Sequence, residues 1–289
     1  MEATVTPAYA TRLGRCYHGD SLAVLPRLKA GSVQLVLTSP PFALRRRKVY
    51  GNVPAAEYVE WYMPFVEQIH RLLRPDGSLV FELAGAYEAG RATRSLFPYE
   101  LIVRIGQLFR LCQEFYWHNP GKLPTPAQWV SIERTRAKDA VTPIWWFAKH
   151  ERPAADNRRV TVPYSTSMRR LLKSGYRRQT SPSGHGHDSA YRKDNGGSIP
   201  PNLIQASNTR SNDPYLRRCK AKGLTPHPAR FVPEVPEFFI KFLTEPGDLV
   251  LDPFAGSNTV GATAEALGRQ WVSVEKEEEY VKGSKLRFR

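Results

Sequence analysis

Two short apolar runs in this sequence stop abruptly in loops that neither a helix nor a central strand could continue. Residues 33–37 (Val-Gln-Leu-Val-Leu) lead into Thr-Ser-Pro-Pro, and residues 249–251 (Leu-Val-Leu) lead into Asp-Pro-Phe-Ala-Gly-Ser-Asn-Thr. Apolar runs of this length, bounded by turn residues, are typical of buried strands. The prolines remove N–H donors that regular structure needs. The sequence therefore predicts two buried strands, each followed directly by a loop.

Helical periodicity alternates with such runs along the chain. Val59, Tyr62, Val66, Ile69 and Leu73 keep the spacing of one helix face. Further strands are predicted at residues 78–83, 144–148 and 271–274, and further helices at residues 99–111, 235–243 and 259–267. Strands that alternate with helices predict an α/β fold with a doubly wound, mainly parallel sheet.

Composition excludes several classes of protein. With 289 residues, 41% hydrophobic and 24% charged, the chain is an ordinary globular one rather than disordered or fibrous. No apolar run approaches 18 residues and the N-terminus lacks a signal-peptide pattern, so we expect no membrane segment and a cytoplasmic location. Three cysteines without Cys-x-x-Cys spacing favour neither a disulfide framework nor a metal site.

The positive charge is concentrated in one segment. The net charge is +15, and residues 151–230 hold 16 Lys and Arg against 5 Asp and Glu. Such a basic segment, with tyrosines among the charges, is typical of a polyanion-binding insert. A solvated surface loop is the alternative. We predict a catalytic core made of residues 1–150 and 226–289, with an inserted basic region at 151–225.

The loop after residue 251 has the features of a cofactor site. The predicted cofactor-binding residues are Asp252, Pro253, Phe254, Ala255, Gly256, Ser257, Asn258, Thr259 and Glu275. Small residues let the backbone approach a ligand, and Asn258 tolerates positive φ. Glu275 lies 23 residues after Asp252 at a strand tip, where a carboxylate can accept ribose hydroxyls. Because no phosphate-binding glycine pattern is present, S-adenosylmethionine is favoured over a dinucleotide. A plain strand-to-helix turn with a surface Glu is the alternative.

The loop after residue 38 has the features of a catalytic site. Its predicted catalytic residues are Ser39, Pro40, Pro41 and Phe42. The diproline stiffens the backbone and leaves carbonyls that only accept hydrogen bonds. The Ser39 hydroxyl and the Pro40 carbonyl could hold an exocyclic amino group while Phe42 stacks on the base. The amino lone pair would then be free to attack a methyl group in line. A rigid strand-to-loop turn is the alternative.

The order of these two loops resembles that of the β-class amino DNA methyltransferases. Ser-Pro-Pro-Phe comes early, Asp-Pro-Phe-Ala-Gly-Ser comes late, and residues 17–21, 72–77 and 227–231 also match that class. The resemblance covers nearly the whole chain. It implies a Rossmann-like methyltransferase core with an inserted target-recognition region, and S-adenosylmethionine as cofactor. It also implies that Asp20 accepts a hydrogen bond from the cofactor adenine.

The resemblance also favours a particular base. Serine at the head of the catalytic motif is similar to the N4-cytosine subgroup, whereas N6-adenine enzymes usually carry Asp or Asn there. C5-cytosine methylation needs a cysteine nucleophile, and none of the three cysteines follows a proline as in that family. We therefore expect methyl transfer to cytosine N4 in duplex DNA, with the base flipped out. N6-adenine methylation, an RNA substrate and an inactive nucleic-acid-binding relic remain as alternatives.

Contacts with DNA are expected outside the two loops. The predicted DNA-binding residues are Arg45, Arg46, Arg47, Lys48, Arg217 and Arg218, which would neutralise phosphates. For the four residues beside the catalytic loop, a solvated lid is the alternative. A restriction endonuclease acting on the same site is the expected partner, unless the enzyme marks the genome alone.

Overall fold

The computed structural model describes residues 6–43, 53–88, 90–174, 194–208 and 213–288. These residues form two compact units. The larger unit consists of residues 1–154 and 202–289, and the smaller consists of residues 155–201.

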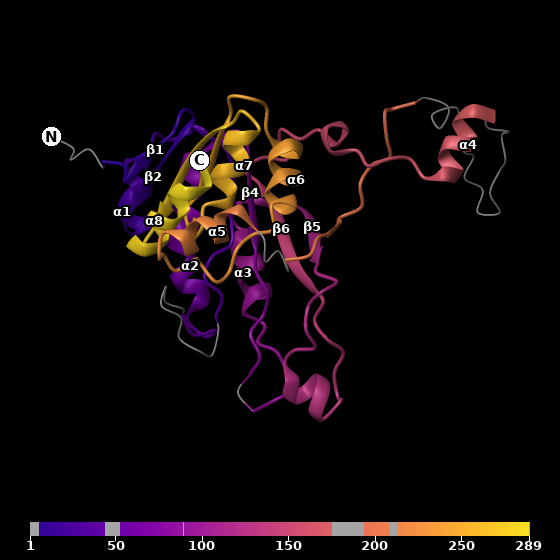
Figure 1. The fold of residues 1–289 in the computed structure, drawn as a ribbon, viewed down its shortest axis with the longest axis horizontal. Coiled ribbons are helices and arrows are strands. Elements are labelled where there is room, and N and C mark those ends of the chain that lie inside the picture. The colour runs from indigo at the N-terminus through magenta and orange to yellow at the C-terminus, as the bar shows by residue number, and fades with distance from the viewer. Residues whose placement is uncertain (1–5, 44–52, 89, 175–193, 209–212, 289) are drawn as a thin grey trace. The chain divides into compact units, whose positions relative to one another are not determined.

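One mixed sheet forms the centre of the larger unit (Figure 1). Its order is β1-β2-β9-β8-β3-β4-β6-β5-β7. The strands are β1 Tyr9–Ala10, β2 Gly14–His18, β3 Val33–Thr38, β4 Leu73–Glu82, β5 Arg110–His118, β6 Val141–Ala148, β7 Leu203–Gln205, β8 Leu249–Asp252 and β9 Gln270–Glu275. β2, β9, β8, β3 and β4 pair in parallel, while β6 is antiparallel to both β4 and β5. The predicted α/β class with a mainly parallel centre is confirmed.

Helices cover both faces of this sheet. The helices of the larger unit are α1 Ser21–Val24, α2 Tyr58–Leu72, α3 Phe97–Ile105, α5 Pro214–Ala221, α6 Glu234–Leu243, α7 Thr259–Ala266 and α8 Glu278–Ser284. α2 packs on α1, α3 and β4, whereas α6 and α7 pack on each other, with α6 against β3 and α7 against β8 and β9. Because successive strand residues point to opposite faces, each central strand buries both of its faces.

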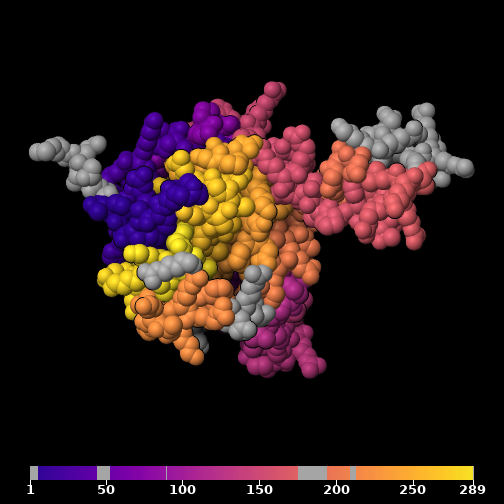
Figure 2. All heavy atoms as spheres, turned by 45° about the horizontal axis from the view of Figure 1, so that its top comes forward, coloured from indigo at the N-terminus to yellow at the C-terminus, as the bar shows by residue number. Residues whose placement is uncertain are grey.

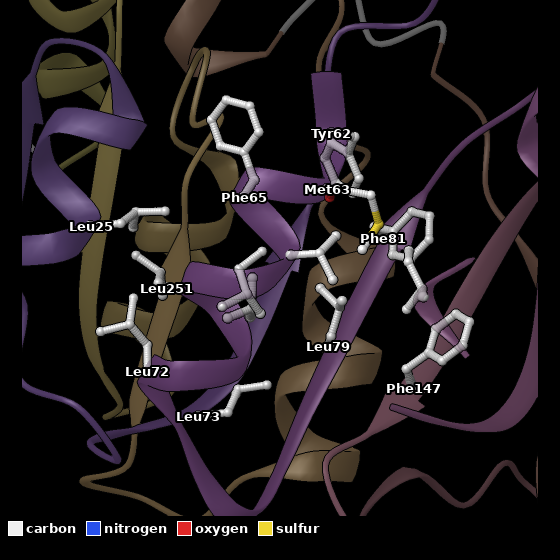
Figure 3. Close-up of a cluster of buried hydrophobic side chains, with 14 of the residues drawn as sticks. Leu25, Tyr62, Met63, Phe65, Leu72, Leu73, Leu79, Phe81, Phe147 and Leu251 are labelled. Atoms are coloured by element: carbon white, nitrogen blue, oxygen red, sulfur yellow. The ribbon is translucent and has the colours of Figure 1, made fainter. Parts of the chain in front are cut away.

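The α2 side of the sheet holds a large apolar cluster (Figure 3). Leu72 at the end of α2 belongs to it together with Leu73, Leu79 and Phe81 of β4 and Leu251 of β8, and all five are fully buried. Burial of each such side chain contributes about 1.5–3 kcal/mol. The helix predicted from the spacing of Val59 onward therefore packs on the central strands. Two of these strands, β3 and β8, lead at their carboxyl ends into the two loops.

Several boundaries differ from the predicted ones. The helix expected at residues 99–111 is α3, which ends at Ile105, and residues 110–111 already belong to β5. The strand expected at residues 78–83 is β4, which already begins at Leu73, and its pairing register with β3 shifts between Val33 and Leu35. Strands β2 and β5 had no prediction, because polar and charged residues interrupt their apolar pattern.

The smaller unit holds a short 3₁₀ turn at Asn157–Val160 and helix α4 at Thr166–Ser174. Val162 and Ser198 form an isolated antiparallel bridge, and the Tyr164 hydroxyl accepts a hydrogen bond of 2.8 Å from the Asn195 N–H.

The separate unit is shorter than the inserted region expected at 151–225. The described residues of its second part, 202–208 and 213–225, pack with the core: β7 extends the sheet beside β5, and α5 buries Tyr215 and Cys219 against Leu286. Figure 2 shows this segment (orange) against the C-terminal residues (yellow). The basic segment and the smaller unit therefore differ in extent, because the Tyr215–Cys219 pair, four residues apart, buries one face of a helix that is otherwise basic.

Candidate active site

The carboxyl ends of β3, β4, β8 and β9 surround a cavity of about 510 Å³ in the larger unit. Open α/β sheets place their ligand sites at this edge. Both predicted loops line it. The predicted residues among its lining are Asp20, Ser39, Pro40, Pro41, Phe42, Asp252, Pro253, Phe254, Ala255, Gly256, Ser257, Thr259 and Glu275. Ser39 and Asp252, which lie far apart in the sequence, thus share one cavity.

Asp252 ties the cofactor loop to the catalytic strand. Its Oδ1 accepts hydrogen bonds from Thr38 Oγ1 at 2.7 Å and from the Phe254 N–H at 3.0 Å. Burial raises the pKa of Asp252 to about 7, against the opposing effect of these two hydrogen bonds. Asp252 therefore joins the ends of β3 and β8 and fixes the start of the loop.

Glu275 holds the cofactor loop from the neighbouring strand. Its Oε2 accepts a hydrogen bond of 2.6 Å from the Gly256 N–H, and its Oε1 accepts one of 2.8 Å from the Glu277 N–H. Burial raises the pKa of Glu275. The Lys276 N–H is a third donor to this carboxylate, which has about four acceptor positions, so about one remains on Glu275 for a ligand hydroxyl. This geometry fits the ribose-binding role predicted for it.

Gly256 brings the backbone close to the opposite wall of the cavity. It has φ +50°, and a Cβ atom here would lie 3.2 Å from the His227 ring. The backbone conformation favours glycine, and a larger residue would require the His227 ring to shift by a few tenths of an ångström. Burial lowers the pKa of His227 to about 4, so the ring is neutral at physiological pH.

Asn258 lies behind the loop rather than in the cavity lining. Its φ of 54° confirms the expected left-handed backbone. The side chain is fully buried: Oδ1 accepts hydrogen bonds from Ser273 Oγ and the Gly261 N–H, and Nδ2 donates to the Tyr9 hydroxyl. Asn258 was predicted as a cofactor contact, but these bonds commit it to shaping the loop.

Arg287 supports the same loop, and the sequence contained no motif that would predict this role. Its Nε donates to the Ser257 carbonyl at 2.6 Å and its Nη2 to Ser257 Oγ at 3.0 Å. The guanidinium also lies 4.2 Å from the centre of the Tyr215 ring and 4.0 Å from Asp213. The only sequence signal is the placement of one arginine between the apolar residues Leu286 and Phe288.

Asp20 borders the cavity at the amino end of α1. It caps this helix by accepting a hydrogen bond of 2.8 Å from the Leu22 N–H, and its Oδ2 lies 4.0 Å from Lys276 Nζ. The neighbouring Ser21 hydroxyl donates to the Pro253 carbonyl. Asp20 is exposed, so its carboxylate is accessible to a ligand that enters this side of the cavity.

The catalytic loop has fewer supports. The Tyr58 hydroxyl donates to the Pro41 carbonyl at 2.8 Å, and Phe42 packs partly against the α2 cluster. Ser39 is half-buried at the cavity wall. Phe254 adds an aromatic wall, its ring centre 4.9 Å from that of Phe65 and 6.0 Å from that of Trp61. The cavity therefore combines planar apolar walls with many polar groups, among them the carboxylates of Asp20, Asp252 and Glu275.

Glu82, at the end of β4, is a further residue of this site that sequence reasoning missed. It lines the cavity beside Ser39 and is hydrogen-bonded to that side chain. Burial raises the pKa of Glu82 to about 7, opposed by the hydrogen bond with Ser39 and by the charge of Lys122. An acid at the tip of the strand next to the catalytic strand was the available signal. A carboxyl group that titrates near neutral pH is suited to accept a proton.

The predicted DNA contacts have different outcomes. Arg45, Arg46, Arg47 and Lys48 lie outside the described residues. Arg217 is exposed on α5, whereas Arg218 is half-buried and its Nη1 donates to the Leu286 carbonyl at 2.7 Å. Part of the role of Arg218 is therefore to attach α5 to the C-terminal segment.

The described part of the chain holds neither a metal-binding cluster nor a membrane-spanning helix. Among the described residues, no group of three or more His, Cys, Asp or Glu side chains could hold a metal ion. Within the same ranges, no helix is long and apolar enough to span a bilayer.

Comparison with known proteins gives the family. A family model described as DNA methylase matches residues 33–286. The chain is 48% identical over 287 residues to the type II methyltransferase M.PvuII of Proteus hauseri, a match that covers 98% of this chain and 85% of that protein.

Solved structures agree with this family. The PvuII DNA methyltransferase, described as cytosine-N4-specific, superposes with a TM-score of 0.79 and 43% identity, covering 98% of this chain and 89% of that one. A putative DNA modification methylase of Thermus thermophilus, complexed with S-adenosyl-L-methionine, shares the fold at 21% identity, with a TM-score of 0.58 and coverage of 96% and 93%. The chain belongs to the DNA methylase family.

Proposed function

We propose that this protein transfers a methyl group from S-adenosylmethionine to the exocyclic N4 of cytosine in duplex DNA. The observation that carries the proposal is the common cavity of the Ser39–Phe42 loop and the Asp252–Thr259 loop. Similarity to M.PvuII and to the cytosine-N4-specific PvuII structure supports the choice of base. The enzyme would act in the cytoplasm beside an endonuclease that cuts the same site.

The residues around the cofactor loop fit S-adenosylmethionine. Glu275 has an acceptor position for a ribose hydroxyl, and Asp20 can accept from an adenine amino group. The neutral His227 and the backbone at Gly256 form a narrow wall without a phosphate cradle. When bound, the cofactor supplies an electrophilic methyl group on a sulfonium, and the chain supplies position and proton acceptors.

The catalytic loop would hold the target amino group by its hydrogens. Ser39 Oγ accepts one N–H while its own hydroxyl donates to Glu82, and the Pro40 carbonyl accepts the other N–H. These bonds orient the nitrogen lone pair toward the methyl group. As the N–C bond would form, the methyl–sulfur bond would break with its electron pair left on sulfur, and the nitrogen would gain a positive charge and then lose one proton. Ser39 can pass this proton to the Glu82 carboxylate.

The position of Phe42 suits the flipped base. It lies at the cavity wall directly after the diproline, so its ring can stack on a base whose amino group reaches Ser39. The rings of Phe254, Trp61 and Phe65 provide further apolar surface. Extrusion of the base into such a pocket is the means by which enzymes reach atoms inside a duplex.

The test is the identity of the methylated nucleoside. Purified protein, unmethylated plasmid DNA and S-adenosylmethionine are incubated, and the DNA is digested and separated by mass spectrometry. We expect N4-methylcytosine. N6-methyladenine would retain the reaction class but overturn the base, and no product together with no cofactor binding would indicate a relic. RNA incubated in parallel tests the alternative polymer.

A further inference from the structure

A projecting arm extends from the edge of the sheet at which the cavity lies (Figure 1). Two segments of the larger unit form it: residues 84–88 and 90–96 after β4, and residues 119–140 between β5 and β6. The arm begins at the cavity itself: Glu82 and Trp117, the last lining residues of these two strands, precede its two segments. At its root Asn119 Nδ2 donates to Oδ1 of the lining residue Asn208 at 2.8 Å.

The two segments are locked together by side chains. The ring of Tyr87 lies between two guanidinium groups, 5.4 Å from that of Arg94 and 5.1 Å from that of Arg136. The Tyr87 hydroxyl donates to Asp139, which also faces Arg94 at 3.7 Å and Arg136 at 4.0 Å. Arg136 in turn donates to the Ala92 carbonyl of the other segment. The arm is thus pre-ordered, which lowers the entropy cost of binding with it.

The far part of the arm has an unusual backbone. A π-helical turn spans Gln128–Ile132, and Arg134 follows with φ 56°. π-turns occur frequently at functional sites. Non-glycine residues rarely adopt positive φ, and apart from Asn258 no other described non-glycine residue does so. Arg134 is exposed, so tight packing does not impose this conformation.

The surface of the arm has the chemistry of a nucleic-acid contact. Its two segments contain six basic residues against three acidic ones. Exposed apolar side chains lie among these charges, with Leu123 73% and Ile132 68% exposed. Cations with adjoining apolar side chains are the combination that DNA-binding proteins place against phosphates and opened base steps.

We propose that this arm contacts the duplex beside the extruded base, with Arg134 on the DNA backbone. The inference rests on the proposed function, because a duplex must approach the cavity for its base to enter. It adds a contact that is separate from the basic segment at residues 151–225. The positive φ of Arg134 would then serve to direct its guanidinium toward the DNA. Backbone strain of this kind costs free energy and persists where function requires it.

The test exploits opposite effects on stability and binding. Arg134→Gly relieves the positive φ, so we expect the melting temperature to rise by about 2 °C. The same change removes a cation, so we expect affinity for sheared unmethylated DNA to fall about three- to tenfold and the salt slope to decrease by about 1. Arg134→Lys should retain most of the affinity, because a phosphate accepts either cation.

The matched control is Arg110→Ala, which removes an exposed arginine at the far end of β5, the strand that leads into the arm. It should leave DNA affinity unchanged. If the wild type and Arg134→Gly bind DNA with equal affinity and equal salt slope, the proposed role of the arm is overturned. The proposed function would still stand in that case, provided that both proteins methylate plasmid DNA. Failure of the wild type itself to bind DNA would overturn both.

Discussion

The cofactor loop and the catalytic loop line one cavity, yet they are held in different ways. Side chains from several elements hold the cofactor loop: Glu275 binds the Gly256 N–H, Arg287 binds Ser257, and Asn258 bonds beneath it. The catalytic loop depends on its two prolines, with one hydroxyl bond from Tyr58 to the Pro41 carbonyl. The first loop is thus fixed in place by side chains around it, whereas the second leaves Ser39 at the cavity wall with Glu82 as its hydrogen-bond partner.

The largest predicted effect breaks the catalytic loop alone. Ser39→Ala removes both the acceptor for the target amino group and the link to Glu82, so we expect the single-turnover rate to fall about 100-fold or more. The dissociation constant for S-adenosylmethionine should stay within about twofold, because Ser39 supports no part of the cofactor loop. An unchanged rate would eliminate its catalytic role.

The next effect breaks the cofactor loop alone. Glu275→Gln keeps the shape of the side chain but removes the charge that strengthens its hydrogen bonds, so cofactor affinity should fall about tenfold. At saturating cofactor the rate should recover, as measured by calorimetry and single-turnover assays together. A dissociation constant equal to that of the wild type would contradict ribose binding by this residue.

The titration of Glu82 should appear in the pH profile. Its pKa is raised to about 7, and only the carboxylate can take the proton from Ser39. The single-turnover rate should therefore rise with pH up to about 7 and level off above it, falling about tenfold per unit well below this value. Glu82→Gln should give a slow rate with a flat profile over this range. A steep wild-type-like profile in the variant would assign the titration to another group.

The same group should affect stability. Burial raises the pKa of Glu82 above its unfolded value of about 4.3, so the folded state binds more protons between these two values. The free energy of unfolding should thus decrease as pH rises from about 4 to about 7, and this contribution should be constant above about 7. Denaturant titrations of the wild type and Glu82→Gln should differ in slope over that interval, and identical slopes would count against the raised pKa.

A smaller effect concerns the support beneath the cofactor loop. Arg287→Met retains an apolar stem but leaves the Ser257 carbonyl without its donor, so the free energy of unfolding should fall by about 1–3 kcal/mol. Cofactor affinity should decline with it. Lys285→Met is the control, because Lys285 is exposed and belongs to the same short 3₁₀ helix, Lys285–Phe288. Equal losses in both variants would show that Arg287 gives the loop no specific support.

The smallest effect is expected at α5. Arg217→Glu should weaken DNA binding several-fold and reduce the salt slope without changing stability, because Arg217 is exposed. Arg218→Glu should also lower stability, since Arg218 holds the Leu286 carbonyl. Arg12→Glu, an exposed change at the β1 edge of the sheet, controls for net charge. An affinity equal to that of the Arg12 variant would remove α5 from the DNA contact.

Much of the fold and of the cavity could be predicted from the sequence. Strands β3 and β8 are apolar runs that end in distinctive loops. The local sequence therefore predicts both the burial of the strands and the site residues of the loops. Glu82 and Arg287 could not be found in this way, because their roles depend on which strand tips and which chain terminus lie beside the loops. The extent of the inserted region was also obscured, because exposed charges on α5 conceal the buried pair Tyr215 and Cys219.

The division of labour between the two loops is tested most directly by the double variant Ser39→Ala/Glu275→Gln. Cofactor affinity and the single-turnover rate at saturating cofactor are measured on unmethylated DNA, with N4-methylcytosine as the quantified product. Independent loops predict the affinity of Glu275→Gln combined with the rate of Ser39→Ala. A rate far below that of Ser39→Ala, or an affinity far below that of Glu275→Gln, would show that the two loops do not act independently.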